Sequence, residues 1–448
     1  MVHGGTMKDL PTISQYQVFK NRKRILKNPL PFHNENFKKF GDIFRVKIGF
    51  GKTVVFTRNP ELIKHILQKQ HKKYYKSPLQ TVDLAKYIGH GILTSNGEHW
   101  RTHRRMVQPA FHKHKLQGLM GIMRNAIQEE LVRIKPNATR DVFPLMGDLA
   151  FQVVAKSLFS RSDIRASMEK LQNITQTNQL MLIREMRQPY LKWWFKRSGQ
   201  IRKHIDLSNQ GRGLLNAIIE ERKESREEKD DLLDMLLKAR YEDGSPMSQQ
   251  QLIDEVLILF TAGHETTANA LSFALYLLAK HQDVQEKVYQ EIASLNFDKG
   301  DMMQQLAEAK LCKQCIEEAM RLYPPAYFID RIAIEEDVFN DRTIPKKTLL
   351  LMSIYELHRH PDFWDSPNEF IPERFNPRNK KDFNAHYHPF GAGPRMCVGN
   401  NFAMYEMMMT LVEILKKYEL RTTLEAVEIN PLISLKPKTV PINFVLRA

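Results

Sequence analysis

The chain has 448 residues, of which 42% are hydrophobic and 26% charged, and its formal net charge is +16 at pH 7. This is enough apolar material for a large core, which excludes a disordered polypeptide. No apolar run reaches the roughly 18 residues that span a bilayer, and three cysteines are too few for a disulfide framework. We therefore expect a cytoplasmic protein without a transmembrane anchor. Its lysines and arginines are spread along the chain, which argues against nucleic-acid binding.

No internal repeat and no linker rich in proline, glycine and serine divides the chain, so we expect one domain over residues 1–448. The first six residues, Met-Val-His-Gly-Gly-Thr, are typical of a leader added by cloning, with Met7 as the native start. Residues 42–50 alternate apolar and polar, and residues 52–57 follow after a glycine, which predicts a hairpin. Pro60 then begins a helix with apolar residues at helical spacing.

Nearly all of residues 98–325 has helical periodicity, whereas residues 326–352 and 430–446 are rich in short strands. These patterns predict a mainly α fold with a small β region (α+β). Ser248 caps an apolar helix that continues to Leu278. This helix is about 30 residues, or roughly 45 Å, long. A helix of such length and apolarity must cross the interior of a domain.

The middle of that helix, residues 262–267, reads Ala-Gly-His-Glu-Thr-Thr. Glycine and two β-branched residues weaken a helix centre, and a threonine hydroxyl can bond back to the carbonyl four residues earlier and bend the helix. Such a bend opens a groove beside the acid Glu265 and the alcohol Thr266, which side by side can deliver protons. The alternative is a polar kink in a core helix. We expect His264 to face away from the groove and not to be a ligand.

The segment 390–399, Phe-Gly-Ala-Gly-Pro-Arg-Met-Cys-Val-Gly, carries the most specific signal. Its glycines allow the backbone to approach a flat ligand closely. Cys397 comes just before a helix expected from Asn400 to Tyr418, whose N-terminal field favours a thiolate. Arg395 can pair with a carboxylate on the ligand. These residues predict a thiolate that is an axial ligand of haem iron; the alternative is a glycine-rich turn around an inert cysteine.

This segment resembles the haem loop of the cytochrome P450 family, Phe-Gly-x-Gly-x-Arg-x-Cys-x-Gly, at every fixed position. The resemblance implies the cytochrome P450 fold. It also implies haem b (iron protoporphyrin IX) bound through Cys397, beside Phe390 and Gly391, with the long central helix over the haem. The family has Ala/Gly-Gly-x-Asp/Glu-Thr-Thr in that helix. Carried over, Thr266 hydrogen-bonds bound dioxygen and its water, and Glu265, which is Asp in many bacterial members, relays protons.

Three arginines match family positions around the haem propionates. Trp100 and Arg104 have helical i,i+4 spacing and are similar to the pair that reaches one propionate. Arg331 and Arg395 match further propionate partners. Three guanidinium groups against two carboxylates are favourable electrostatics.

Glu318 and Arg321 have the spacing of an ordinary surface ion pair on a helix. Together with Arg374 downstream they resemble the buried network that holds the haem-loop side of the family's core, so we assign them to structure. Cys312 and Cys315 form a Cys-x-x-Cys pair without a second pair, and we expect them to be inert helix cysteines.

The resemblance implies monooxygenation, in which one oxygen atom enters a substrate C–H bond and the other leaves as water. Because no flavin domain is attached, we expect electrons from a ferredoxin and its NAD(P)H-dependent reductase, and a monomeric enzyme of bacterial type. The basic surface is then a docking face or simply a solvated surface. Two alternatives are a peroxide-using relative, against which Glu265 and Thr266 argue, and a haem-binding sensor without turnover.

Substrate contacts are expected, by family position, in loop 77–95, in a lid around 176–200, near Ala262, at 326–328 and at 433–434. Residues 190–197 of the lid interleave aromatic and basic side chains, which suits a membrane surface, a sugar, an anionic tail or a packed helix corner. The sequence is rich in lysine, asparagine and isoleucine, as in marine flavobacteria. Family members there demethylate 6-O-methyl-galactose oxidatively and release formaldehyde. We therefore expect this reaction, with fatty-acid or terpenoid hydroxylation as the alternative.

Overall fold

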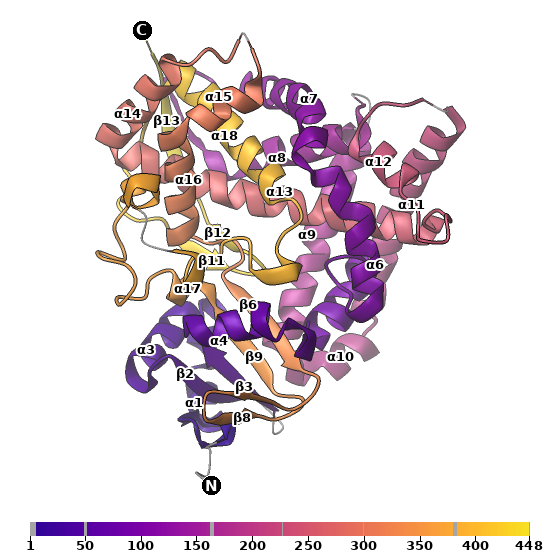
Figure 1. The fold of residues 1–448 in the computed structure, drawn as a ribbon, viewed down its shortest axis with the longest axis vertical. Coiled ribbons are helices and arrows are strands. Elements are labelled where there is room, and N and C mark those ends of the chain that lie inside the picture. The colour runs from indigo at the N-terminus through magenta and orange to yellow at the C-terminus, as the bar shows by residue number, and fades with distance from the viewer. Residues whose placement is uncertain are drawn as a thin grey trace.

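The computed structural model describes residues 6–48, 52–161, 165–225, 227–298, 300–379 and 383–447. Helices dominate this part of the chain, and the largest sheet forms the lower end of the molecule in Figure 1. The predicted mainly α fold with a small β region is confirmed. Most of the leader proposed for residues 1–6 lies outside the described residues.

The α-helices are α1 (Gln15–Lys20), α2 (Arg22–Lys27), α3 (Leu30–Phe40), α4 (Pro60–Lys64), α5 (Ala85–Ile88), α6 (Gly97–Val107), α7 (Lys113–Leu131), α8 (Val142–Phe159), α9 (Arg165–Arg187), α10 (Lys192–Arg197), α11 (Gln200–Ser225), α12 (Leu232–Lys238), α13 (Gln249–Lys280), α14 (Gln282–Ala293), α15 (Met302–Glu308), α16 (Lys310–Leu322), α17 (Ile354–Leu357) and α18 (Asn400–Lys417). The strands are β1 (Thr12–Ile13), β2 (Ile43–Ile48), β3 (Lys52–Thr57), β4 (Tyr74–Tyr75), β5 (Ala138–Asp141), β6 (Phe328–Ala333), β7 (Asp337–Phe339), β8 (Arg342–Ile344), β9 (Leu349–Ser353), β10 (Tyr418–Arg421), β11 (Ile429–Pro431), β12 (Leu435–Pro437) and β13 (Pro441–Leu446).

The largest sheet has the strand order β1-β2-β3-β9-β6-β4. β2 and β3 pair antiparallel, with Ile43 opposite Thr57, so the predicted hairpin is present, and its turn at 49–51 lies outside the described residues. β9 pairs parallel with β3 and antiparallel with β6. The sheet thereby joins the N-terminal hairpin to the strand-rich segment expected at 326–352.

The long helix α13 begins after Ser248, whose hydroxyl accepts a hydrogen bond of 3.2 Å from the Gln251 N–H, as predicted. It crosses the middle of the molecule (Figure 1) and packs along α8. Gly263 allows this close packing, because a Cβ there would lie 3.1 Å from a methyl group of Val154. The helix is continuous over its 32 residues.

α8 is itself long and apolar enough to span a membrane by length and composition. This corrects the expectation that no such run exists. However, 67% of that segment is buried inside the protein, where it packs against α7 and α13. Burial on both sides marks α8 as part of the core.

Two strand regions depart from the predicted elements. β5 interrupts the region expected to be helical, and β10 follows directly after α18. Both pair with β13, with Asp141 opposite Pro441 and Tyr418 opposite Leu446. A short strand of this kind is stabilised by partners distant in the sequence, so local periodicity does not reveal it.

Candidate functional site

The loop before α18 is shaped by its glycines. Gly391 and Gly393 have φ angles of +74° and +70°, which glycine adopts without strain. The Gly391 N–H donates to the His388 carbonyl at 3.1 Å, and the Cys397 N–H donates to the Phe390 carbonyl at 2.9 Å. These turns bring Cys397 to the N-terminal end of α18, as predicted.

The Cys397 thiol is accessible. The protein around it raises its pKa by desolvation, while an N–H···S hydrogen bond from Gly399 and the charge of Arg104 act in the opposite direction. A thiol that is accessible yet surrounded by protein must face an internal space or a pocket. The N–H donor and the guanidinium are the two features that stabilise a thiolate at this position.

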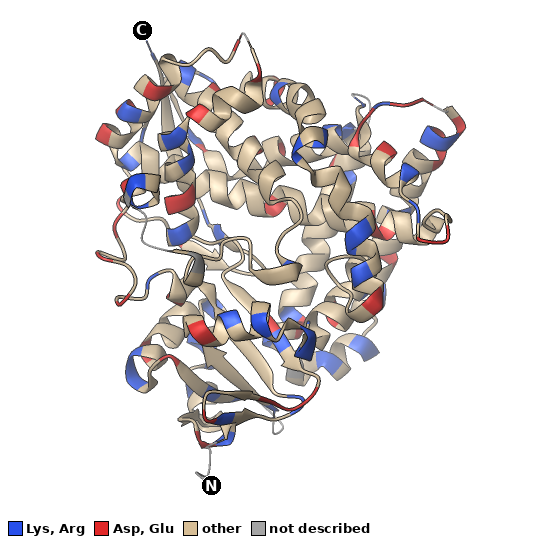
Figure 2. Cartoon of the chain, viewed as in Figure 1, with Lys and Arg blue, Asp and Glu red and all other residues tan. Residues whose placement is uncertain are grey.

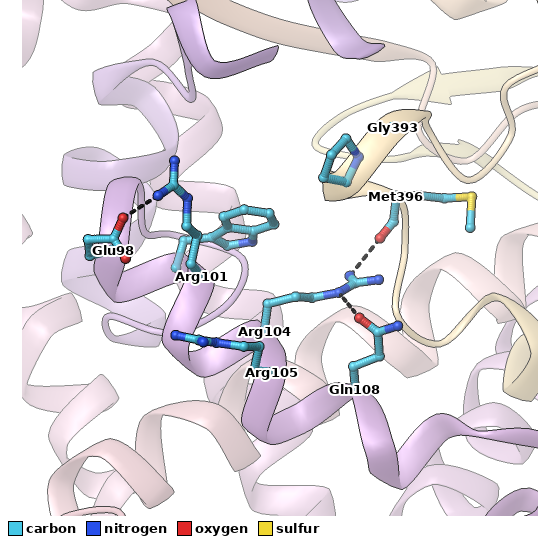
Figure 3. Close-up of a pocket in the computed structure, with 9 residues that line it drawn as sticks. Glu98, Arg101, Arg104, Arg105, Gln108, Gly393 and Met396 are labelled. Atoms are coloured by element: carbon cyan, nitrogen blue, oxygen red, sulfur yellow. Dashed lines mark hydrogen bonds and ion pairs between the residues drawn. The ribbon is translucent and has the colours of Figure 1, made fainter. Parts of the chain in front are cut away.

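Trp100 and Arg104 of α6 lie against the loop that carries Arg395 and Cys397. The Arg104 guanidinium donates to the Met396 carbonyl at 2.7 Å and to Gln108 at 2.9 Å (Figure 3). Arg395 lies over the Trp100 ring, 4.3 Å from its centroid. A pocket of about 640 Å³ opens here between α6 and the loop, and its lining includes three arginines of α6.

Four cations gather beside the loop and are called here the cation cluster: Lys76, Arg104, Arg331 and Arg395. Within the described residues, none of them forms an ion pair with a carboxylate. Lys76 donates to the carbonyls of Ile92, at 3.1 Å, and Leu93, while Arg331 donates to the Asp330 carbonyl at 2.7 Å.

The members of the cation cluster destabilise one another. Burial, followed by the charges of Arg331 and Arg395, holds the pKa of Lys76 well below its ordinary value. Burial, followed by Arg331, lowers the pKa of Arg395 to about 10. Such a group of cations is expected to bind an anionic ligand, because unpaired buried charge is costly. Lys76 was missed in the sequence because it lies in no motif.

The centre of α13 has the predicted back-bond, since the Thr266 hydroxyl donates to the Ala262 carbonyl at 2.9 Å. Ala262 is exposed, although it lies midway along a core helix, so there is open space in front of it. His264 is buried on the other side against the rings of Phe151 and Phe260. It faces α8, as expected for a residue that is not a ligand.

Glu265 has a partner that the sequence did not reveal. Its carboxylate accepts a hydrogen bond from Ser434, and Ser434 in turn accepts one of 2.8 Å from the Asn269 side-chain amide. Ser434 lies in the turn between β11 and β12, a segment that was expected only to contact substrate. Asn269, one helical turn after Glu265, was the available signal.

The comparisons with known proteins identify the family. The model of the family described as cytochrome P450 matches residues 11–444. The chain belongs to the cytochrome P450 family. The heme domain of a cytochrome P450DA mutant, solved by crystallography, has the same fold, with a TM-score of 0.83 and 23% identity over 94% of each chain. This P450 is therefore a haem-iron monooxygenase, as predicted from the cysteine loop.

Curated relatives cover most of this P450. Human cytochrome P450 4A11 is 33% identical over 83% of this chain and 75% of its own. Cytochrome P450 CYP72A613 of Trigonella foenum-graecum is 28% identical over 91% and 80%. The cyclooctat-9-en-7-ol 5-monooxygenase of Streptomyces melanosporofaciens is 28% identical over 85% and 83%. These sources are an animal, a plant and a bacterium, so they give no support to the bacterial type or to the sugar-demethylase subtype.

The site suits the family's haem group. Haem has two propionates, which match the cation cluster, and an iron that takes a thiolate ligand. The loop also approaches the segment after α4 closely at Gly393, since a Cβ there would lie 2.0 Å from the Leu67 carbonyl oxygen. Phe390 is partly buried and packs against the main core. The loop is thus tied to both the core and the helix region after α4.

The predicted structural network is present. Arg321 donates to both Glu318 oxygens at 2.7 and 2.8 Å, and Arg374 donates to Glu318 at 3.3 Å. Glu318 and Arg321 are fully buried. Arg321 further donates to backbone carbonyls of residues 358, 367 and 369, so it fastens the chain that leads to the haem loop.

The Cys-x-x-Cys pair is inert, as expected. Cys312 and Cys315 are fully buried in α16, and burial raises the pKa of both thiols. A thiol that stays protonated and is shielded from solvent does not act as a nucleophile.

The basic aromatic segment at 190–197 is not a packed corner. Tyr190, Trp193 and Trp194 are exposed, whereas Phe195 is buried, with the Arg184 guanidinium over its ring. Lys192 pairs with Asp83 at 2.6 Å, which links this segment to loop 77–95. The segment therefore forms one edge of the region expected to contact substrate.

Proposed function

We propose that Cys397 is the axial thiolate of haem b and that Lys76, Arg331 and Arg395, together with Trp100 and Arg104, hold its propionates. The observation that carries this is the accessible Cys397 thiol beside four cations with no carboxylate partner in the described chain. Haem bound through a thiolate supplies activated oxygen at an iron whose electron density favours O–O cleavage.

Two residues of α13, Thr266 and Glu265, then deliver protons. The Thr266 hydroxyl rests on the Ala262 carbonyl and can turn to donate into the open space in front of Ala262. Glu265, the next residue, is an acid that can exchange a proton with water beside that hydroxyl. An acid and an alcohol in this order support net delivery of protons to bound oxygen.

Replacement of Thr266 tests this role and separates the enzyme from a sensor. In Thr266→Ala, product formed per NAD(P)H should fall several-fold, with the difference appearing as peroxide or water. Thr410→Ala is the matched control, because Thr410 makes the same back-bond, to Glu406, in α18. A sensor would show unchanged ligand affinity and no turnover in either protein. Product coupling like that of the wild type in Thr266→Ala would overturn the assignment.

We infer that the enzyme is cytoplasmic and monomeric, as expected from the sequence. We also infer that its electrons come from a ferredoxin. Support comes from the pocket next to the cysteine loop, which is lined by Arg101, Arg104 and Arg105 with Glu98 as its acidic residue. Basic residues mark this stretch of α6 in Figure 2. An acidic partner docked there would be steered by charge.

Charge reversal tests the docking face. Arg105→Glu should slow reduction by ferredoxin, and raised salt should slow the wild type in the same way. Arg24→Glu is the control on a different helix. Equal reduction rates for the two variants would contradict docking at α6.

The substrate is inferred to be apolar. Leu84, Leu93, Phe328 and Ile433 lie in the expected contact segments and are only partly buried, and Ala262 is exposed in the middle of α13. The relative from Streptomyces is named for its action on cyclooctat-9-en-7-ol. The methylated sugar has only the amino-acid composition in its favour, so it is an outcome of the same test.

A titration of the ferric protein, followed at the Soret band, decides the substrate class. Fatty acids and terpenoid alcohols should displace the iron-bound water and shift the band toward high spin, whereas 6-O-methyl-galactose should not. A saturable shift with the sugar alone, followed by formaldehyde release, would replace the apolar substrate with oxidative O-demethylation.

A further inference from the structure

Glu265 is joined to two buried side chains that the mechanism above does not use. Ser434 donates to the carboxylate, and the Asn269 amide donates to Ser434 at 2.8 Å. Ser434 is 5% exposed and Asn269 is fully buried, whereas Glu265 is only partly buried. The three side chains thus lead from an accessible acid into the core.

The position of Ser434 is fixed from outside α13. The next residue, Leu435, donates its N–H to the Pro325 carbonyl at 2.9 Å, and the Tyr327 hydroxyl donates to the Leu432 carbonyl at 2.7 Å. The turn between β11 and β12 is therefore anchored to the segment before β6. Ser434 reaches Glu265 from a fixed backbone, so its hydroxyl is set in place.

Asn269 carries an unused acceptor. Among the described residues, its buried side-chain oxygen has no hydrogen-bond partner, and an unpaired buried acceptor is costly. Rotation of the amide by half a turn exchanges its nitrogen and its oxygen. In one orientation Asn269 donates to Ser434, and Ser434 donates to an ionised Glu265. In the other, Ser434 donates to Asn269, and its oxygen accepts from a protonated Glu265.

We propose that Ser434 and Asn269 form a reversible hydrogen-bond chain that holds Glu265 in both its ionised and its protonated form. Ser434 is then a positioning residue for proton delivery, and this role rests on the proposed function of Glu265. The proton of Ser434 stays on its oxygen throughout. Only the direction of donation changes when Glu265 gives up or regains its own proton.

The other titratable groups near this chain are His264 and Lys436. Burial lowers the pKa of His264, the charge of Glu265 raises it and that of Lys436 lowers it. His264 faces the rings of Phe151 and Phe260, away from Ser434. Within the described residues, neither group is hydrogen-bonded to Glu265, Ser434 or Asn269. The Ser434 hydroxyl is therefore the direct partner of Glu265, and the Asn269 amide is the partner of Ser434.

The test compares Ser434→Ala with Ser434→Thr in the haem-loaded enzyme with its electron donor. In Ser434→Ala, product per NAD(P)H should fall several-fold, peroxide should rise, and the solvent isotope effect on turnover should change. Ser434→Thr keeps the hydroxyl and should restore all three. Ser272→Ala, which removes a buried hydroxyl bonded to the Ala268 carbonyl, should behave like the wild type.

Two further variants separate the possible failures. Glu265→Gln should uncouple as strongly as Ser434→Ala; if it does not, the proposed role of Glu265 is wrong. If Glu265→Gln uncouples while Ser434→Ala behaves like the wild type, only the inference about Ser434 is overturned. Asn269→Leu should also uncouple, and normal coupling there would remove Asn269 from the chain. Unchanged Soret spectra, with and without carbon monoxide, show that each variant is folded and contains haem.

Discussion

Gly393 lies so close to Leu67 that a side chain on it would collide with the Leu67 carbonyl oxygen at 2.0 Å. The loop that carries Cys397 is therefore built against the helical segment after α4. Its φ of +70° adds a second reason for glycine. The two constraints together fix the backbone of this loop against the segment after α4.

We expect Gly393→Ala to lose most of its haem. The positive φ alone costs about 1–3 kcal/mol for a non-glycine residue, and the backbone contact adds to it. Haem per protein, measured after purification, should be far below that of the wild type. Gly399→Ala is the control, because a Cβ there would meet Phe111 at an ordinary 3.7 Å. Full haem loading of Gly393→Ala would contradict this view of the loop.

Lys76→Met should weaken haem binding while sparing the fold. If Lys76 donates to a propionate, its loss should cost about 1.5–3 kcal/mol, which is at least about tenfold in affinity. The checks are the rate of haem transfer to apomyoglobin and the rise in Tm on haem binding. Lys73→Met is the control, since Lys73 pairs with Asp337 at 2.9 Å. An equal Tm rise in Lys76→Met and the wild type would remove Lys76 from the site.

The buried Glu406 carboxyl is expected to make the stability of the protein depend on pH. Within the described residues its buried oxygens have no hydrogen-bond partner, and burial raises its pKa well above the ordinary 4.5. Below pH 4.5 the group is protonated in both the folded and the unfolded state. As the pH rises further, the unfolded state ionises first, so the free energy of unfolding falls by up to about 1.4 kcal/mol per pH unit.

Glu406→Gln removes that loss. Its free energy of unfolding, relative to the wild type, should increase between pH 4.5 and pH 8, as measured by urea unfolding. Glu406→Met is also neutral and should show the same trend, whatever its offset. A difference that does not change with pH in either variant would contradict the raised pKa.

The buried Glu318 network should be sensitive to the loss of one partner. Glu318→Gln leaves Arg321 and Arg374 without their carboxylate, which is expected to cost about 3–5 kcal/mol. Urea unfolding measures this cost. Lys313→Gln, which breaks a pair with Glu317 on the same helix, should cost less than about 1 kcal/mol. Similar losses in the two variants would show that the network is no stronger than a surface pair.

The features that could be predicted from the sequence are local. The cysteine loop, the Ser248 cap and the Thr266 back-bond depend on residues within a few positions of one another. Their residue types and spacing carry the information, because glycine angles and hydroxyl caps are short-range effects. The network of Glu318 and Arg374 was predicted only through the family resemblance.

The contacts that the sequence did not reveal join segments that are distant in the chain. Lys76 reaches the cation cluster through the fold, and Ser434 reaches Glu265 across 169 positions. The pairing of β5 with β13 is of the same kind. No periodicity or motif encodes such contacts, since each depends on how whole elements pack.

The spectrum of the reduced protein with carbon monoxide reports which residue is the iron ligand, and the proposed function depends on that ligand. We predict the strongly red-shifted Soret band of a thiolate-bound haem in the wild type. In Cys397→His the band should move to the position typical of an imidazole ligand. A wild-type band already at the imidazole position, or a red-shifted band that survives in Cys397→His, would contradict the assignment of Cys397.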